Sequence, residues 1–397
     1  MKQIQEAYIV AATRTPVAKR NGMFRNVRPD DMLAHVLSAV VAKVPGLDAT
    51  EIGDVVVGCA MPEAEQGMNV ARIGVLLAGL PNTVPGITIN RFCSSGLQAV
   101  ADAAARIRLG EADVMIAAGT ESMTVMPQIM GNKISLNPAI FAKDENLGIA
   151  FGMGLTAEKV AQQWGIDRAA QDAFAVQSNQ RAAAAIAAGA FRDEITPYTV
   201  RTHVPGEGGT VRVTERICDT DEGPRGDATV ESLGKLKPVF AARGSVTAGN
   251  SSQMSDGAGA VLLMSEAAVK RYGVKPIARF CSYSVAGVPP EIMGIGPVEA
   301  IPRALKAAGI QQSDLNWIEL NEAFAAQALA VMKQLDMDQS KINPQGGAIA
   351  LGHPLGATGV IRAATLMSAF QRTSARYGMI SMCIGTGMGA AGIFEKV

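Results

Sequence analysis

The sequence predicts an α/β fold composed of two similar halves. Short apolar runs alternate with segments of helical spacing from the first residues onward, an order typical of strands and helices packed in layers. The last third of the chain repeats this order at an offset of about 265 residues, which favours an internal duplication. The chain has 397 residues, enough for two or three domains of roughly 100–200 residues and for a large buried core.

The first third of the chain contains the clearest elements. Its expected strands are short apolar runs, and the last of them is almost continuously apolar, as in a sheet buried on both faces. The expected helices have apolar residues at intervals of three and four, and the second one ends at Gly110. We expect strands at 8–12, 54–58, 87–89 and 113–119, and helices at 31–44 and 97–107.

Two pairs of segments carry the repeat. Residues 309–318 resemble 46–55, and residues 376–383 resemble 111–118. Identity within each pair is low, so chance explains either pair alone as well as duplication does. Two pairs in the same order make duplication the better interpretation.

A segment of different composition, about residues 120–250, separates the halves. It contains a methionine-bearing stretch at 122–138, a long alanine-rich helix at 167–188 and a polar, glycine-rich run at 205–226. Two interpretations stay open: an insertion that covers a ligand site, or a surface elaboration or oligomer contact. Met123, Met126 and Met130 could form a binding surface, although methionine more often fills gaps in a core.

Composition excludes several classes of protein. Lys plus Arg and Asp plus Glu both number 36, and this balance argues against a general nucleic-acid binder. No continuous apolar run reaches the roughly 18 residues that a membrane span needs. The termini carry no signal-peptide, retention or prenylation pattern, so a soluble cytoplasmic protein is expected. The five cysteines include no C-x-x-C pair, which argues against a disulfide framework and a structural zinc site.

Cys93 is the first candidate for chemistry. It lies in the run Asn-Arg-Phe-Cys-Ser-Ser-Gly-Leu (90–97), where an expected strand ends and a helix begins, with Ser94 and Ser95 as capping candidates. The positive end of a helix dipole lowers the pKa of a thiol and favours the nucleophilic thiolate. An activated nucleophile is therefore expected, with a buried structural cysteine as the alternative.

His353 is the second candidate, because residues 343–359 surround it with glycines and prolines on a turn before a helix. Small neighbours let a substrate approach closely, and a neutral imidazole can take a proton from a thiol near pH 7. A hydrogen-bonded loop histidine is the alternative. Neither phosphate-loop pattern, G-x-x-x-x-G-K-[ST] or G-x-G-x-x-G, occurs in this run.

Two further motifs follow buried strands. In residues 381–389, Cys383 precedes alternating glycines whose N–H groups could form an oxyanion hole, with the thiol beside it as an acid or base. A tight turn between two strands is the alternative. In residues 319–324, the amide of Asn321 could hold a water or polarise a carbonyl.

Together the four motifs resemble those of the thiolase family, and the match extends over essentially the whole chain. The resemblance implies two duplicated α/β halves in a five-layer αβαβα arrangement, with an inserted loop domain. The matching segments are 90–96, 321–324, 352–359 and 383–389, with 247–252 and 255–258 resembling the linker between insertion and core. The implied division is an N-terminal half (1–121, continued by 250–271), a loop domain over the CoA site (122–249) and a C-terminal half (272–397).

The resemblance also implies a reaction. His353 would activate Cys93, whose thiolate attacks the keto carbon of a 3-ketoacyl-CoA. Cys383 would protonate the departing acetyl-CoA enolate, Asn321 would hold a water, and the N–H groups of Cys93 and Gly385 would form the oxyanion hole. CoA is a substrate, and no metal or redox cofactor is required. Implied CoA contacts are Met153, Arg225 at the nucleotide end, Ser232, Ala248, Ser252 at the pantetheine amide, and Phe324.

The expected branch is degradative, cleaving 3-ketoacyl-CoA in fatty-acid β-oxidation. Family members specialised for acetoacetyl-CoA tend to carry a histidine where this chain has Gly152, and Thr386 also fits the degradative pattern. A biosynthetic acetyl-CoA acetyltransferase is the close alternative. A ketosynthase, which needs two catalytic histidines, and an inactive acyl-CoA-binding subunit are more remote. Family membership implies a homodimer or homotetramer, with 122–138 as a candidate contact, and leaves association with other β-oxidation enzymes open.

Overall fold

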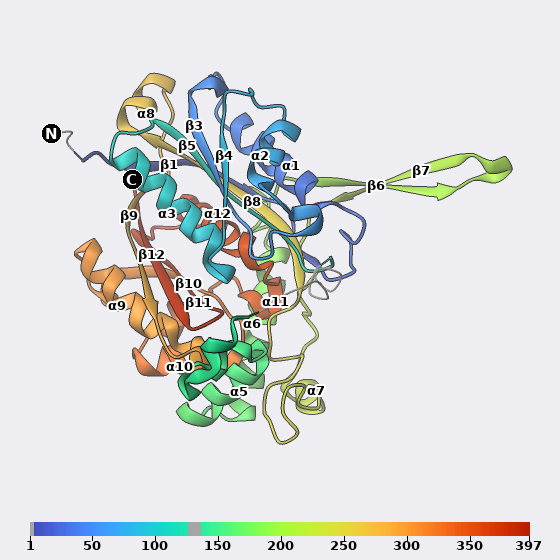
Figure 1. Ribbon diagram of the computed structural model, residues 1–397, viewed down its shortest axis with the longest axis vertical. Helices are drawn as coiled ribbons and strands as arrows, with labels where there is room; N and C mark the ends of the chain where they lie inside the picture. The colour runs from blue at the N-terminus through green and yellow to red at the C-terminus, as the bar shows by residue number, and fades with distance from the viewer. Residues whose placement is uncertain (1–3, 126–135) are drawn as a thin grey trace.

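A computed structural model describes residues 4–125 and 136–397, and within these residues its centre is one mixed ten-stranded sheet (Figure 1). The strand order is β10-β11-β12-β9-β1-β8-β5-β3-β4, with β2 (Ala18–Lys19) paired to β8. The first-half strands are β1 (Ala7–Arg14), β3 (Ile52–Gly58), β4 (Gly86–Ile89), β5 (Val114–Ser122) and β8 (Ser255–Ser265). The second-half strands are β9 (Ala278–Gly287), β10 (Leu315–Leu320), β11 (Tyr377–Ile384) and β12 (Met388–Lys396).

The strand order confirms the duplication. The first half runs β4-β3-β5-β8-β1, and the second half runs β10-β11-β12-β9, with a parallel bridge from Ile318 to Ile342 in the place of β4. The two pairs of similar segments give β3 with β10 and β5 with β11, which occupy equivalent positions. The halves join where β1 and β9 pair antiparallel at Tyr8–Arg279 and Ile9–Ala278.

Helices form three layers around the two halves of the sheet, in agreement with the predicted α/β class. Helices α3 and α12 pack against each other between the halves, in an apolar cluster shared by strands of both. Helices α1 and α2 cover the outer face of the first half, and α9 and α10 that of the second (Figure 1). The helices of the two halves are α1 (Pro29–Ala42), α2 (Val70–Leu77), α3 (Ser95–Arg108), α8 (Glu266–Tyr272), α9 (Gly296–Ala308), α10 (Ala325–Gln334), α11 (Ala348–Leu351) and α12 (Thr358–Arg372).

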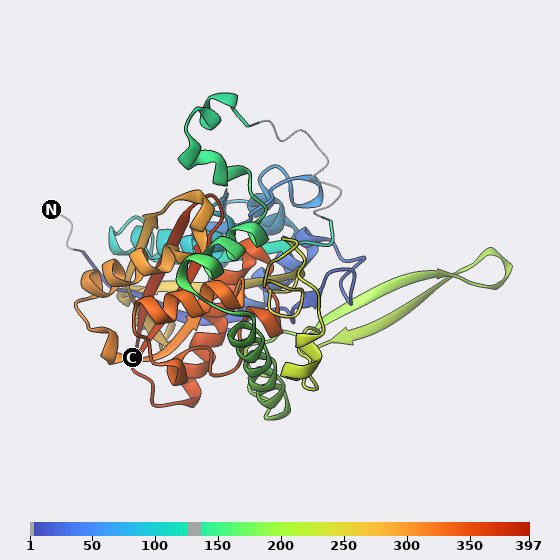
Figure 2. The ribbon, with the colours of Figure 1, turned by 90° about the horizontal axis from the view of Figure 1, so that it is seen from below.

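The segment between the halves forms helices and a two-stranded hairpin. It contains α5 (Met153–Trp164), α6 (Arg168–Ala187), α7 (Val230–Gly234), β6 (Tyr198–Pro205) and β7 (Val211–Cys218). The hairpin projects from the body of the molecule in both views (Figures 1 and 2). Strand β7 falls in the run expected to be polar and glycine-rich, and nearly all its residues are exposed. Val211, Val213 and Ile217 alternate with polar residues there, a strand signal that the prediction did not use.

Of the methionines considered as a binding surface, Met123 is buried, and its sulfur accepts the Ser255 N–H at 3.3 Å. This position fits a packing role. Met126, Met130 and most of the candidate contact at 122–138 lie outside the described residues.

Candidate active site

Cys93 lies where strand β4 leads into helix α3, in the 3₁₀ turn Phe92–Ser94. Phe92 has a φ of 44°, in the left-handed region that residues with side chains rarely adopt. Ser95 holds the turn closed, since its hydroxyl accepts from the Arg91 N–H at 2.8 Å and donates to the Phe92 carbonyl at 2.7 Å. The local sequence thus fixes the cysteine at the start of a helix, as expected.

Burial outweighs the helix start at Cys93, so the net change of its pKa is opposite to the predicted one. The thiol is buried, and loss of solvation raises the pKa of Cys93 to about 11 despite N–H groups from Gly385 and from Cys93 itself. Ser94 occupies the N-cap position, but its hydroxyl contacts Tyr283 at 3.2 Å instead of capping the helix. The resting nucleophile is therefore a protonated thiol.

Gly385 brings a backbone N–H to the Cys93 sulfur from the turn between β11 and β12. The next two residues, Thr386 and Gly387, have φ values of 72° and 92°. The Thr386 hydroxyl donates to the Gly385 carbonyl, which lies on the peptide that follows the one carrying this N–H. Two N–H groups converging on one sulfur can stabilise negative charge that develops there.

Cys383 lies near the end of β11 and is fully buried. It belongs to an apolar cluster with Met293 and Phe324. Burial raises the pKa of Cys383 well above its ordinary value, and a thiolate at Cys93 raises it further, so the two sulfurs lie within electrostatic reach of each other. A thiol that stays protonated in such a site can donate a proton to a forming carbanion or enolate.

His353 lies in the turn between α11 and α12, and its ring is held from both sides. Its Nδ1 is 2.6 Å from the Thr358 hydroxyl, and its Nε2 is 3.4 Å from the amide nitrogen of Asn321. An amide nitrogen only donates, so Nε2 accepts and Nδ1 carries the proton. Burial, aided by the positive charge of Arg362, lowers the pKa of His353 to about 3. The imidazole is therefore neutral, and Nε2 is its unprotonated nitrogen.

Asn321 follows the last residue of β10, and its N–H donates to the Ser381 carbonyl at 2.8 Å. This parallel pairing sets the amide beside the strand that carries Cys383. Its Oδ1 is buried and lacks a hydrogen-bond partner among the described residues. A buried carbonyl oxygen without a partner is unfavourable, so this atom is suited to accept from a water or a substrate group.

Glycines let the cysteine and histidine segments meet. A Cβ on Gly96 would lie 2.8 Å from the Val360 nitrogen, and one on Gly359 would lie 2.0 Å from the Leu97 nitrogen. Helices α3 and α12 therefore touch backbone to backbone near their N-termini. The turn that bears Cys93 also contacts the turn that follows His353. One helix from each half thus contributes its N-terminal end to the same site.

Two buried carboxylates hold these segments, and the sequence analysis missed both. Glu121, at the end of β5, accepts the N–H groups of Ala60 at 2.7 Å and Gly356 at 2.8 Å. Glu322 accepts from the Asn343 amide at 2.7 Å and so braces the loop before His353. A charged residue closing an otherwise apolar strand was the signal available for Glu121.

The other two histidines lie on different elements. His35 is on α1 with its ring 4.9 Å from that of Tyr198, and His203 is in the projecting hairpin. Neither belongs to the cluster around Cys93, so the second histidine that a ketosynthase needs is missing from it.

Three of the expected CoA contacts lie beside the catalytic cluster. A Cβ on Gly385 would stand 3.5 Å from the Met153 sulfur. The Ser252 N–H donates to the Ala323 carbonyl at 2.9 Å, next to Phe324. The Phe324 ring is buried and packs edge-on against Phe240, with ring centroids 6.1 Å apart.

The other three are exposed: Arg225 and Ala248 on the segments that flank α7, and Ser232 within α7. The Ser232 hydroxyl takes part in a capping box with Thr229, so its local role is to start α7. The Arg225 N–H donates to the Asn179 side chain at 2.9 Å, which fixes the backbone and leaves the guanidinium exposed.

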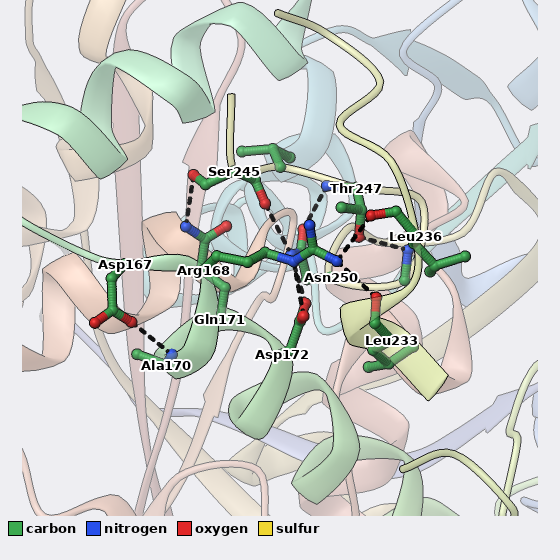
Figure 3. Close-up of polar contacts among 12 residues, drawn as sticks. Asp167, Arg168, Ala170, Gln171, Asp172, Leu233, Leu236, Ser245, Thr247 and Asn250 are labelled. Atoms are coloured by element: carbon green, nitrogen blue, oxygen red, sulfur yellow. Dashed lines mark hydrogen bonds and ion pairs between the residues drawn. The ribbon is translucent and has the colours of Figure 1, made fainter. Parts of the chain in front are cut away.

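A polar network fixes the segment that follows α7 against helix α6 (Figure 3). The Asn250 amide, which is buried, donates to Asp172 at 2.9 Å and to the Ser245 carbonyl at 3.1 Å. Arg168 bonds Asp172 at 2.7 Å and the Leu233 carbonyl at 2.6 Å. The network sets the position of the backbone on which Ala248 and Ser252 lie, and the sequence analysis did not single out its α6 members.

Among the residues that the structure describes, no group of three or more His, Cys, Asp or Glu side chains is arranged to hold a metal ion. In the same part of the chain, no helix has the length and apolar character to cross a membrane.

Comparison with known proteins matches this arrangement to one family over nearly the full chain. The family description "Thiolase, N-terminal domain" matches residues 7–267, and "Thiolase, C-terminal domain" matches residues 274–396. The chain is 49% identical to a 3-ketoacyl-CoA thiolase of Bacillus subtilis over 393 residues, which cover 99% of this chain and all of the relative. It is 48% identical to the peroxisomal 3-ketoacyl-CoA thiolase 2 of Arabidopsis thaliana over 98% of this chain and 84% of the relative. A solved acetyl-CoA acetyltransferase of Bacillus anthracis covers both chains fully, with a TM-score of 0.90 and 38% identity.

Proposed function

The chain belongs to the thiolase family, and we propose that it is an acyltransferase that cleaves 3-ketoacyl-CoA with CoA to give acetyl-CoA and a shortened acyl-CoA. The observation that carries the proposal is the convergence of the Gly385 N–H, the Cys383 thiol and the Cys93 thiol, with Cys93 on a turn that contacts the segment following the neutral His353. A nucleophile, a proton donor and an oxyanion hole are the groups that thiolytic cleavage needs.

The first half-reaction forms an acyl-enzyme. Nε2 of His353 takes the proton of Cys93, and the sulfur attacks the keto carbon of the substrate. The oxyanion that forms accepts hydrogen bonds from the N–H groups of Cys93 and Gly385. The bond between the keto carbon and its α-carbon then breaks, and Cys383 protonates the α-carbon, releasing acetyl-CoA. Asn321, through a water at its Oδ1, stabilises the enolate on the way.

The second half-reaction transfers the acyl group to CoA. The Cys383 thiolate takes the proton of an incoming CoA thiol, whose sulfur attacks the thioester. The carbon–sulfur bond to Cys93 breaks, and the Cys93 thiolate recovers its proton from the His353 imidazolium. No metal or redox group enters either step, and CoA is a substrate. The covalent intermediate replaces one difficult step with two easier ones.

The raised pKa of Cys93 and the lowered pKa of His353 determine which charges form during this reaction. Both groups are neutral in the resting site, so proton transfer between them creates two buried charges. The oxyanion hole and the bound substrate supply the compensation, which ties thiolate formation to substrate binding.

The degradative direction, within fatty-acid breakdown, fits better than biosynthetic condensation. The two reported relatives that are named 3-ketoacyl-CoA thiolases are 49% and 48% identical, against 38% for the acetyltransferase structure. A Cβ at Gly152 would meet no atom within 4 Å, so the space beside Met153 is open. Open space there among the described residues supports a substrate longer than acetoacetyl-CoA.

CoA itself is proposed to lie along the loops that flank α7. Arg225 would meet the nucleotide phosphates and Ser252 the pantetheine amide, with Ser232, Ala248, Met153 and Phe324 along the path. The exposure of Arg225 and the position of Met153 beside Gly385 support the two ends of this path.

The thiolysis rate with 3-ketoacyl-CoAs of four to sixteen carbons tests the proposal. We expect activity to extend beyond the four-carbon substrate. Loss of the nucleophile in Cys93→Ala should lower kcat by roughly 10³-fold or more, whereas Cys281→Ala, a half-buried cysteine on β9, should retain activity. Activity confined to the four-carbon substrate would assign the enzyme to the biosynthetic branch. An active Cys93→Ala variant would show that Cys93 is not the nucleophile.

Three properties remain proposals drawn from the family. The chain is divided at 121, 249 and 271 into the two halves and a loop domain. It forms a homodimer or homotetramer, which light scattering measures. It acts in the cytoplasm, as expected for a relative of a bacterial enzyme, although plant relatives carry a peroxisomal name.

A further inference from the structure

A buried pair of opposite charges lies on the strand and the helix whose ends hold the His353 ring, and one of its charges acts on that ring. Glu319 and Arg362 are 1% and 3% exposed, and the guanidinium nitrogen is 3.6 Å from Oε2 of the carboxylate. Burying an ion pair is unfavourable unless its geometry is good or it serves another purpose. The second oxygen of Glu319 accepts from the Trp317 ring nitrogen at 2.6 Å, but Oε2 has no hydrogen bond among the described residues.

The local periodicities explain why this pair faces His353. In the strand β10, side chains alternate, so Glu319 shares a face with Asn321, which contacts Nε2. In the helix α12, positions four apart share a face, so Arg362 stands one turn below Thr358, which contacts Nδ1. Asn321 and Thr358, which hold the ring, therefore form one layer. The charged pair forms the next layer on the same strand and helix.

We propose that Glu319 and Arg362 are positioning residues that set the basicity of His353 in the reaction. The guanidinium opposes the imidazolium that forms when His353 takes the proton of Cys93. The carboxylate of Glu319 offsets that charge. Ionised Glu319 thus makes His353 a better base, and neutral Glu319 makes it a worse one.

The charges around the pair support this role. Arg362 is the charged group that lowers the pKa of His353 after burial, and its charge also acts on Glu322. Burial raises the pKa of Glu319 to about 7; Arg362 and Trp317 oppose the rise, and Glu194 and Glu322 add to it. Glu319 therefore changes charge close to neutral pH.

The sign of the pH dependence follows. Above about pH 7, Glu319 is ionised and balances Arg362, so the imidazolium is less disfavoured. As the pH falls through about 7, Glu319 takes up a proton, Arg362 is left unbalanced, and proton transfer from Cys93 slows. His353 and Cys93 stay neutral across this range, so their own titration does not cause the fall in rate below about pH 7. We call this fall the acidic limb of the pH profile.

The test uses the whole enzyme, and this inference rests on the proposed function. We expect kcat/KM of the wild type to decline below about pH 7. Glu319→Gln should lower kcat/KM at pH 8 by about tenfold, a fraction of the 10²–10⁴ that general-base catalysis contributes. It should also abolish the acidic limb, the decline of kcat/KM below about pH 7. Removing both charges in Glu319→Gln/Arg362→Met should recover part of the loss. Glu51→Gln, in an exposed ion pair with Arg271 on other elements, is the control and should keep the wild-type profile.

A second readout requires no turnover, and it follows the titration in the wild-type enzyme. The chain has three histidines, so ¹³C-labelled imidazole carbons give three signals by NMR, and that of His353 is assigned by its loss in His353→Gln. In the wild type, we expect the His353 signal to remain that of a neutral ring but to shift with a midpoint near pH 7, as Glu319 titrates. A His353 signal that is flat from about pH 5.5 to 8.5, or a Glu319→Gln enzyme with the wild-type rate and limb, overturns the inference. Thiolysis that persists in either case leaves the proposed function standing, whereas absent thiolysis with a shifting signal contradicts the function alone.

Discussion

At the scale of single residues, burial governs the chemistry. The sequence predicted that a helix dipole would lower the pKa of Cys93, but burial raises it to about 11. The same effect keeps Cys383 protonated and His353 neutral. Desolvation of a charge inside a large protein exceeds the influence of one helix end, so proximity to a helix start is a poor guide to the pKa of a buried thiol.

Thr386 concentrates backbone strain at the oxyanion hole. A β-branched residue with a φ of 72° is an outlier, and such strain costs about 1–3 kcal/mol. We expect Thr386→Gly to raise the free energy of unfolding by about 1 kcal/mol, because glycine tolerates this conformation. We also expect kcat/KM to fall by roughly tenfold, less than the 10²–10³ for losing an oxyanion donor, since the turn that carries the Gly385 N–H loses the hydrogen bond from the hydroxyl to the Gly385 carbonyl.

Urea unfolding and steady-state kinetics measure the two effects. Asp336→Gly is the control, because Asp336 has a φ of 47° on an exposed loop; its stability should rise with no change in rate. A Thr386→Gly enzyme with full activity would show that the hydroxyl has no part in forming the hole.

At the scale of elements, helix α6 supports the loops that we propose to bind CoA. The sequence predicted this helix at 167–188 from its alanine-rich composition, and it spans Arg168–Ala187 with Asp167 as its N-cap. The polar residues near its start were not predicted to matter. Their partners lie about 60 to 80 residues further along the chain, and no local pattern reports contacts of that separation.

Arg168→Met should therefore weaken CoA binding more than it slows chemistry. Arg168 donates to the Leu233 and Leu236 carbonyls at 2.6 and 3.0 Å. Together the two lost hydrogen bonds contribute about 1–3 kcal/mol, so the KM for CoA should rise by roughly 5-fold or more, with kcat nearly unchanged. Arg303→Met, which removes an exposed ion pair with Glu299 on α9, is the matched control. A lower kcat at constant KM would contradict a role in positioning the loop.

At the scale of the whole molecule, the active site depends on how closely the two halves approach. Each half contributes the N-terminal end of one central helix, and glycines at the crossing allow backbone contact. The duplication therefore serves the chemistry directly: equivalent positions in the two halves provide the nucleophile before α3 and the histidine before α12.

Gly359→Ala should disrupt this crossing. The added Cβ would lie 2.0 Å from the Leu97 nitrogen, and backbone on both sides cannot move aside as a flexible side chain would. Overpacking typically costs about 1–3 kcal/mol and more against a rigid backbone, so we expect a loss of at least about 3 kcal/mol. Thermal unfolding measures it, with Gly287→Ala as the control, since a Cβ there meets nothing within 4 Å. A wild-type melting temperature for Gly359→Ala would refute the close crossing.

The sequence by itself determined the fold class, the duplication and the family, and with it the candidate roles of Cys93, Asn321, His353 and Cys383. These follow from local patterns: apolar periodicity, glycine-rich turns and short motifs at fixed spacing. Only the tertiary structure decided the protonation states and the supporting residues, among them Glu121, Glu322, Glu319 and Arg362. Their behaviour depends on burial and on charges contributed by distant segments, and those exist only once the two halves have packed together.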